Sequence, residues 1–200
     1  SEPVSELAAG EQLFEEMELG GTVNFIAFRQ AVAGYNRIKE KSKPILTLID
    51  FSKPSTEKRF FVFDMEKKKL LYSSVVAHGR NSGENYATSF SNQYGSYKSS
   101  LGFYLTENTY QGGNGYSLIL NGLEKGINDK AKARSIVVHG APYANPSVAA
   151  SGRLGRSLGC PALPTKLARP IINTIKDGSV MFIYANNPHY LAQSNILHKN

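Results

Sequence analysis

The sequence has a single cysteine, Cys160, and only four histidines among its 200 residues. One cysteine excludes an internal disulfide, and no histidines or cysteines have the spacing of a zinc site. No apolar run approaches the roughly 20 residues that a membrane-spanning helix needs, and no signal peptide is visible. We therefore expect no metal, no cofactor and no transmembrane segment.

Acidic residues are also few, 16 against 23 lysines and arginines, which leaves a formal net charge of +7. The basic residues are scattered, and their one run, 67–69, lies between two strand-like segments as a solvated turn would. This distribution argues against a nucleic acid partner and is compatible with an anionic polymer or an acidic peptide. The length fits one domain with a full core, and we expect a monomer.

Apolar residues at helical spacing predict two N-terminal helices and one later helix. Leu7, Phe14 and Met17 share one face of residues 5–19, and Asn24 can cap the second helix. The later helix covers residues 165–176, where Pro170 is expected to shorten it and Gly178 to cap its end.

Apolar, β-branched or aromatic runs predict seven strands, the second and third joined as a hairpin by a short polar link: 45–51, 60–64, 70–77, 101–105, 116–120, 135–138 and 179–185. Seven strands with few helices indicate a mainly β fold of the α+β class, an antiparallel or mixed sandwich or barrel. The polar tail from Asn186 onward is expected to lie as a strap over the surface.

Two long segments, 78–100 and 139–165, show no helix or strand pattern. Loops of more than roughly 15 residues in a compact domain are usually functional or disordered, and the aromatic residues of the first segment argue against disorder. The second segment begins with His139, at the end of a strand, and contains Cys160. These two residues are a candidate base and nucleophile.

A thiol has a pKa of about 8.5, so only a few per cent is thiolate at neutral pH and Cys160 needs activation. Pro161 disfavours helical backbone at Cys160, which excludes activation by a helix dipole and favours a side chain, with His139 as the best candidate. A lone cysteine is more often an inert, buried residue. The pair alone therefore leaves both readings open.

Pro161 has no N–H, so donors to an oxyanion must come from Cys160 and the residues before it. The N–H of Gly159 is expected to be available, with Leu158 N–H as a further donor. Ser157 could orient the imidazole or donate to the substrate.

These residues resemble the murein L,D-transpeptidases, whose hallmark is His-Gly at a strand end followed by Ser/Thr-His-Gly-Cys. Residues 155–163, GRSLGCPAL, are similar to a divergent branch in which the motif reads Gly-Arg-Ser-x-Gly-Cys-Pro-Ala-Leu. The sequence departs from the commoner motif at Leu158, where a second histidine usually stands, and at Ala162, where a polar residue is common. Further likeness extends over roughly residues 22–185, with matches at 76–79, 89–92, 98–104 and 122–124.

The resemblance implies an L,D-transpeptidase-like β sandwich or barrel. With the helical spacing described above, we expect a helical segment over residues 1–42 packed on a catalytic domain over 43–200. It implies Cys160 as the nucleophile and His139 as the base. Gly159 and Cys160 would supply the backbone donors, with Gly140 and Ser157 as supports. His78 could fill the place of the missing histidine. No acidic partner of His139 is evident, so a backbone carbonyl is expected to fix its tautomer.

By the same resemblance, Cys160 would form a thioester with a peptidoglycan stem tetrapeptide, release D-alanine and transfer the acyl group to an amine. Water as the acceptor would make the protein an L,D-carboxypeptidase. Arg153 and Arg156 could bind carboxylates of the stem through bidentate contacts. The family implies an exported protein of the bacterial periplasm or cell envelope, and carbapenem-type β-lactams are expected to acylate Cys160.

Other protein classes fit the sequence less well. Papain-like wall peptidases place cysteine before histidine, whereas here His139 precedes Cys160. Sortases share this order, but their cysteine lies at a strand end with an arginine further on. A wall-binding module that keeps the fold without turnover stays open, because Leu158 replaces the second histidine.

Overall fold

The computed structural model describes the backbone of residues 4–198 and the side chains of residues 8–198. Eight strands form one mixed sheet in the order β3-β2-β1-β8-β4-β5-β6-β7. Their bounds along the chain are β1 Ile45–Asp50, β2 Phe60–Asp64, β3 Lys69–Ser74, β4 Gly102–Gly112, β5 Gly115–Gly122, β6 Val137–Gly140, β7 Ala162–Leu163 and β8 Val180–Tyr184.

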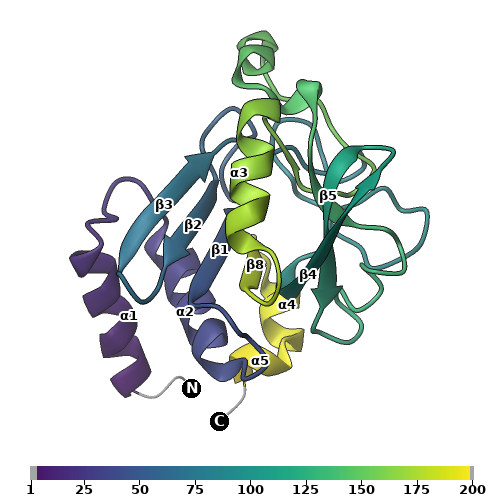
Figure 1. Cartoon of the computed structure of the whole chain (residues 1–200). Coiled ribbons are helices and arrows are strands. Elements are labelled where there is room, and N and C mark those ends of the chain that lie inside the picture. Colours follow the sequence, from purple (N-terminus) through teal and green to yellow (C-terminus); the bar gives the residue numbers. More distant parts are fainter. Residues whose placement is uncertain (1–3, 199–200) are drawn as a thin grey trace.

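Helices lie at the chain ends and between the last strands (Figure 1). They are α1 Val4–Glu16, α2 Phe25–Arg37, α3 Thr165–Ile175, α4 Pro188–Gln193 and α5 Asn195–His198, with short 3₁₀ helices η1 Pro142–Ala144 and η2 Pro146–Ser151. The expected mainly β fold of the α+β class, with two N-terminal helices and a later one, is confirmed. No helix among residues 4–198 is long and apolar enough to cross a membrane.

Each of the seven expected strands is present, with most boundaries displaced by up to three residues, whereas the strand expected over 101–105 continues to Gly112. The β2–β3 hairpin is antiparallel, as expected. The sequence pattern missed β7, because two residues are too few to show an alternation.

The centre of the sheet is buried on both faces. Every residue of β1 and β8 is buried, and these two strands pair in parallel. Helix α3 crosses one face of the sheet, and α2 lies behind it on the other (Figure 1). A strand that is covered on both sides reads as a continuous apolar run, which is why both were visible in the sequence.

The start of α2 is fixed by the predicted cap. The side chain of Asn24 accepts hydrogen bonds from Ile26 N (2.9 Å) and Ala27 N (3.3 Å). The helix then packs into the core, where the rings of Phe28 and Phe63 meet with centroids 5.1 Å apart. The division expected between a helical segment, residues 1–42, and a catalytic domain, residues 43–200, stays a prediction. Helix α2 shares one hydrophobic core with the sheet.

Of the three residues predicted on one face of the first helix, Met17 is buried and Phe14 packs against the core. The ring of Phe14 lies 5.8 Å from that of Phe28. The side chain of Leu7 lies outside the described residues.

The expectation that Pro170 shortens the later helix is wrong. Pro170 lies inside α3, which continues to Ile175, and Lys176 is its C-cap. Pro170 and Lys166 are both exposed, so water can solvate the carbonyl that loses its helical partner. Buried residues of the opposite face keep the helix on the sheet. Gly178 lies beyond the C-cap with φ 103°.

The tail is not a strap. It forms α4 and α5, which a buried carboxylate holds to the core: Glu124 accepts hydrogen bonds from Tyr190 Oη (2.7 Å) and Ser194 Oγ. Burial raises the pKa of Glu124, and these hydrogen bonds oppose that rise.

The two edge strands are joined beside the predicted motif. The segment that continues β3 pairs with residues 157–162, which lead into and begin β7, through Ala77 N to Ala162 O (2.9 Å), Ser157 N to His78 O (3.0 Å) and Arg80 N to Ser157 O (2.8 Å). These bonds nearly close the sheet into a barrel and satisfy backbone groups that an open edge would expose.

The contact between α2 and β4 generates a stability prediction. A Cβ at Gly34 would lie 2.1 Å from the ring of Phe103, so Gly34→Ala is expected to overpack the core and lower the free energy of unfolding by about 1–3 kcal/mol. The matched control is Gly10→Ala, also in a helix, where the nearest atom would be 3.5 Å away and alanine should stabilise slightly. Urea unfolding measures both, and equal stability of Gly34→Ala and the wild type would contradict the predicted contact.

Candidate active site

The two candidate catalytic residues lie at the same edge of the sheet. His139 is on β6 and pairs with Ala162 on β7, two residues after Cys160. Its N–H donates to Pro161 O at 3.4 Å. The fold thus brings together a histidine and a cysteine that are 21 positions apart in the sequence.

Cys160 is free and 8% exposed. Its Sγ accepts a hydrogen bond from Val137 N at 3.4 Å and lies 3.6 Å from Ser135 O, to which the thiol donates. Burial raises the pKa of the thiol, while Val137 N–H and the charge of Arg134 lower it. The resting side chain is therefore mainly the neutral thiol at pH 7, and a base is needed to use it as a nucleophile.

His139 has its tautomer fixed by the backbone. Its Nδ1 lies 3.0 Å from Gly140 O, and a carbonyl can only accept, so Nδ1 carries the proton and Nε2 the lone pair. The expected backbone carbonyl partner is confirmed. Burial lowers the pKa of His139, and the bond to Gly140 opposes this. A neutral imidazole at pH 7 has the form that a general base requires.

Ser157 holds the turn that precedes the thiol. Its Oγ accepts from Gly159 N (3.1 Å) and donates to Cys160 O (2.6 Å). The expectation that Gly159 N–H is available to an oxyanion is therefore wrong, and the serine hydroxyl is not directed at the imidazole. Within the described residues neither Cys160 N–H nor Leu158 N–H donates to an acceptor, so these two of the expected donors stay available.

Two glycines are required by close approaches at the site. Gly159 has φ 127°, and a Cβ there would lie 2.8 Å from Ile136 Cδ1. A Cβ at Gly140 would lie 2.8 Å from that of Ala168 on α3. Both positions let the backbone carrying the site pack against its neighbours without a side chain.

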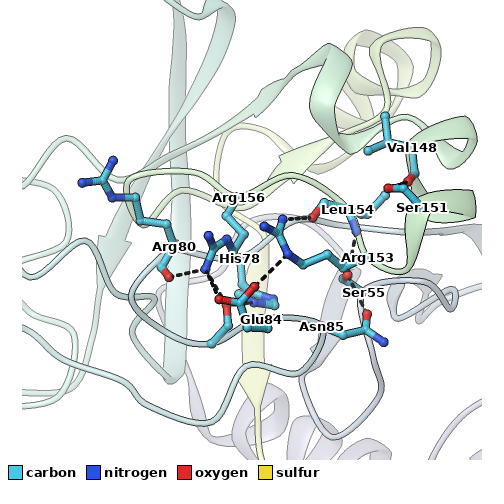
Figure 2. A network of polar contacts seen from close by, with 11 residues as sticks. Ser55, His78, Arg80, Glu84, Asn85, Val148, Ser151, Arg153, Leu154 and Arg156 are labelled. Carbon is cyan, nitrogen blue, oxygen red and sulfur yellow. Dashed lines mark hydrogen bonds and ion pairs between the residues drawn. The ribbon is translucent and has the colours of Figure 1, made fainter.

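Arg153 and Arg156, in the loop that leads to Cys160, both pair with the carboxylate of Glu84. Figure 2 shows Glu84 between the guanidinium groups of Arg153 and Arg156, with N–O distances of 2.9 Å and 3.2 Å. Arg156 also donates to Arg80 O at 2.9 Å. The side chain of Glu84 is 75% exposed, so these are weak surface pairs that a substrate carboxylate can replace. Their binding of substrate stays a prediction.

His78 has a structural position, contrary to the expected substrate contact. It is 1% exposed, its Nδ1 accepts from Arg59 Nη2 (2.9 Å), and its Nε2 donates to Gly83 O (3.1 Å). Burial, and then the charge of Arg59, lower its pKa to about 4. His78 is therefore a neutral residue that supports the loop carrying Glu84 and does not replace the missing second histidine.

Leu158, which occupies the position of that histidine, is 57% exposed in the turn of residues 157–160 that precedes the thiol. Two residues that the sequence pattern did not reveal also act electrostatically on the site. Arg134 lowers the pKa of Cys160, and burial together with the thiolate charge raises the pKa of Tyr143 to about 12. Neither belongs to a local motif, so no signal in the sequence singled them out.

Among residues 4–198 no three histidine, cysteine or acidic side chains are grouped to hold a metal.

A family model for the L,D-transpeptidase catalytic domain matches residues 20–184. The chain belongs to this family. The match begins before α2 and ends with β8, so it includes one of the two N-terminal helices. No curated protein gives a significant match to the chain.

Solved structures resemble this L,D-transpeptidase domain at low identity. An L,D-transpeptidase from Mycobacterium smegmatis is 14% identical over 71% of this chain and 59% of that chain, with a TM-score of 0.45. L,D-transpeptidase 3 from Mycobacterium tuberculosis, in complex with a faropenem-derived adduct, is 14% identical over 71% and 60%, with a TM-score of 0.46. A mutant of the helical cell shape determining protein Pgp2 from Campylobacter jejuni is 15% identical over 79% and 55%, with a TM-score of 0.49. The chain therefore spans about six tenths or less of these structures.

The buried His78 generates a pH prediction. Its pKa is about 4 in the folded protein and about 6.5 in the unfolded chain, so the unfolded state binds more protons between these values. The free energy of unfolding should therefore fall as the pH drops from 6.5 to 4, by up to about 3 kcal/mol from this residue.

His78→Gln, whose amide can also accept and donate, should flatten this dependence, and His189→Gln, on the exposed face of α4, should not. Urea unfolding between pH 4.5 and 7 measures the slopes. An unchanged slope in His78→Gln would exclude His78 as the titrating group.

Proposed function

We propose that this domain is a peptidoglycan L,D-transpeptidase that forms a Cys160 thioester with a stem tetrapeptide, releases D-alanine and transfers the acyl group to an amine. The observation that carries the proposal is the position of the single thiol at the edge that holds His139, whose Nδ1–H is committed to Gly140. Family membership supports the class of reaction.

In the proposed first step, Nε2 of His139 takes the proton from Cys160 Sγ, and the sulfur attacks the carbonyl carbon of the amide that joins a diamino acid to the terminal D-alanine. Cys160 N–H donates to the oxyanion that forms. The imidazolium then gives its proton to the departing amine, the C–N bond breaks, D-alanine leaves, and a thioester remains on Cys160.

In the second step, His139 accepts a proton from the incoming amine, which attacks the thioester carbonyl. The C–S bond breaks, and the proton on the imidazole returns to the sulfur. Water in place of the amine gives a free acid, which is the L,D-carboxypeptidase alternative. The same base serves both steps because the neutral imidazole is restored each time.

We also propose that carbapenem-type β-lactams acylate Cys160. Attack of the sulfur on the strained lactam carbonyl breaks the C–N bond without loss of a fragment, so the protein gains the full mass of the compound. The adduct in the solved Mycobacterium tuberculosis structure is a property of that protein. A cell-envelope location and stem-peptide partners follow from the proposed reaction, and the monomeric state stays a prediction.

The functional prediction concerns purified tetrapeptide muropeptides incubated with the protein and analysed by mass spectrometry. The wild type should release D-alanine and form crosslinked products. Cys160→Ala and His139→Gln should each lose at least about 10³-fold in rate, since one removes the nucleophile and the other the base. His189→Gln, at an exposed histidine, is the matched control and should keep full activity.

The products separate the candidate activities. D-alanine without crosslinks would identify the carboxypeptidase. Binding of muropeptides without release of D-alanine would identify a non-catalytic wall-binding module, which the exposed Leu158 and the buried thiol leave as the main rival. Full activity of Cys160→Ala would overturn the thioester mechanism.

A further inference from the structure

The proposed proton transfer has an electrostatic difficulty. Burial raises the pKa of the Cys160 thiol and lowers that of the His139 imidazole, so both shifts oppose transfer of a proton from sulfur to nitrogen. Pro161 follows the thiol and excludes the helix-dipole solution, and Leu158 supplies no charge. A cation near the sulfur would reduce the gap.

Arg134 occupies the required position. It lies in the turn before β6, where its neighbour Ser135 adopts φ 58° and directs its carbonyl to Cys160 Sγ at 3.6 Å. The guanidinium approaches the residue before the thiol, because Nη2 of Arg134 lies 3.5 Å from the position that a Cβ of Gly159 would take. The backbone of Ser135 and the guanidinium of Arg134 thus both lie close to residues 159–160.

The guanidinium is fixed in place but not neutralised. It donates four hydrogen bonds to the loop of residues 91–100, to Ser91 O (3.0 Å), Ser100 Oγ (2.9 Å), Ser96 Oγ (3.0 Å) and Lys98 O (2.9 Å). All four acceptors are uncharged oxygens, so the positive charge stays available to the sulfur. A partly buried charge is also screened less by salt than one on the surface.

The other titratable groups at the site carry no positive charge before the thiolate forms. Tyr143 of η1 has its pKa raised to about 12 and is neutral near pH 7. His139 of β6 has a lowered pKa and is neutral until it accepts the proton. Arg134 is the group that carries a charge at every stage of the reaction.

We propose that the guanidinium of Arg134 stabilises the thiolate of Cys160 and, through the same side chain, positions the 91–100 loop against the nucleophile. This inference rests on the proposed function in one respect, that Cys160 is the nucleophile. Residues 91–100 of the long irregular segment then have a function, because they supply the four acceptors that fix the guanidinium near Cys160.

The test measures the alkylation of Cys160 by iodoacetamide as a function of pH, followed by intact-protein mass. Because the chain has one cysteine, all of the signal comes from this thiol. In Arg134→Gln the apparent thiol pKa should rise by about one unit. Alkylation at pH 7 should slow about threefold to tenfold, since the higher intrinsic reactivity of a more basic thiolate offsets part of the loss.

Two further variants separate charge from structure. Arg134→Lys loses the planar fork that binds the loop but keeps the charge, so its apparent thiol pKa should stay within about half a unit of the wild type. Arg169→Gln removes an equal charge from an exposed position of α3, where the guanidinium stacks on Tyr116, and should shift nothing.

An unchanged thiol pKa in Arg134→Gln, or an equal rise in Arg134→Lys and Arg134→Gln, would overturn the inference. If Arg134→Gln does not fold, Arg134→Lys decides alone: a rise of a full unit or more rejects an electrostatic role. The measurement needs no peptidoglycan, so it stands even if muropeptide turnover is absent, and failure of the proposed function is detected separately by the muropeptide assay.

Discussion

The backbone pairing of residues 77–80 with residues 157–162 is the constraint on which the site depends. It joins the two edges of an eight-stranded sheet at the point where the motif turn begins. Ser157 takes part twice, because its backbone pairs with His78 and Arg80 while its hydroxyl ties Gly159 to Cys160. The thiol is thereby held by the closure of the sheet, and the loop before it can stay irregular.

One side of this closure rests on a buried cation. Arg59 is fully buried, donates to Val76 O through Nε (3.1 Å) and Nη2 (2.6 Å), and stacks on Phe51. Burial of a guanidinium is costly unless its donors are satisfied, and His78 supplies one of the acceptors by staying neutral. Arg134 is only partly buried and binds the 91–100 loop. Arg59 thus fixes the segment that leads into residues 77–80, and Arg134 fixes the loop whose Lys98 carbonyl lies next to Gly159.

Much of the fold was predictable because the central strands are covered on both faces, which leaves continuous apolar runs in the sequence. The cap at Asn24 was predictable for an equally local reason, since its side chain accepts hydrogen bonds from the backbone N–H groups two and three residues later. Features that depend on distant partners were not. Strand β7 exists through pairing with β6 and the 77–80 segment, α4 is fixed by Glu124, and Pro170 is tolerated because its side of α3 faces water.

The sequence by itself determined the family, the fold class and the candidate pair Cys160 and His139, because these reside in local patterns and in one contiguous motif. It contains a second His-Gly at a strand end, at His78, that looks the same. Only the tertiary structure separated the two. The imidazole of His78 is enclosed between Arg59 and Gly83, whereas His139 lies at the sheet edge that carries Cys160, with its Nδ1 bonded to Gly140 O. Burial and charge depend on neighbours brought from distant parts of the chain, and for that reason the surroundings of His78, Gly159 and Arg134 were decided by the folded molecule.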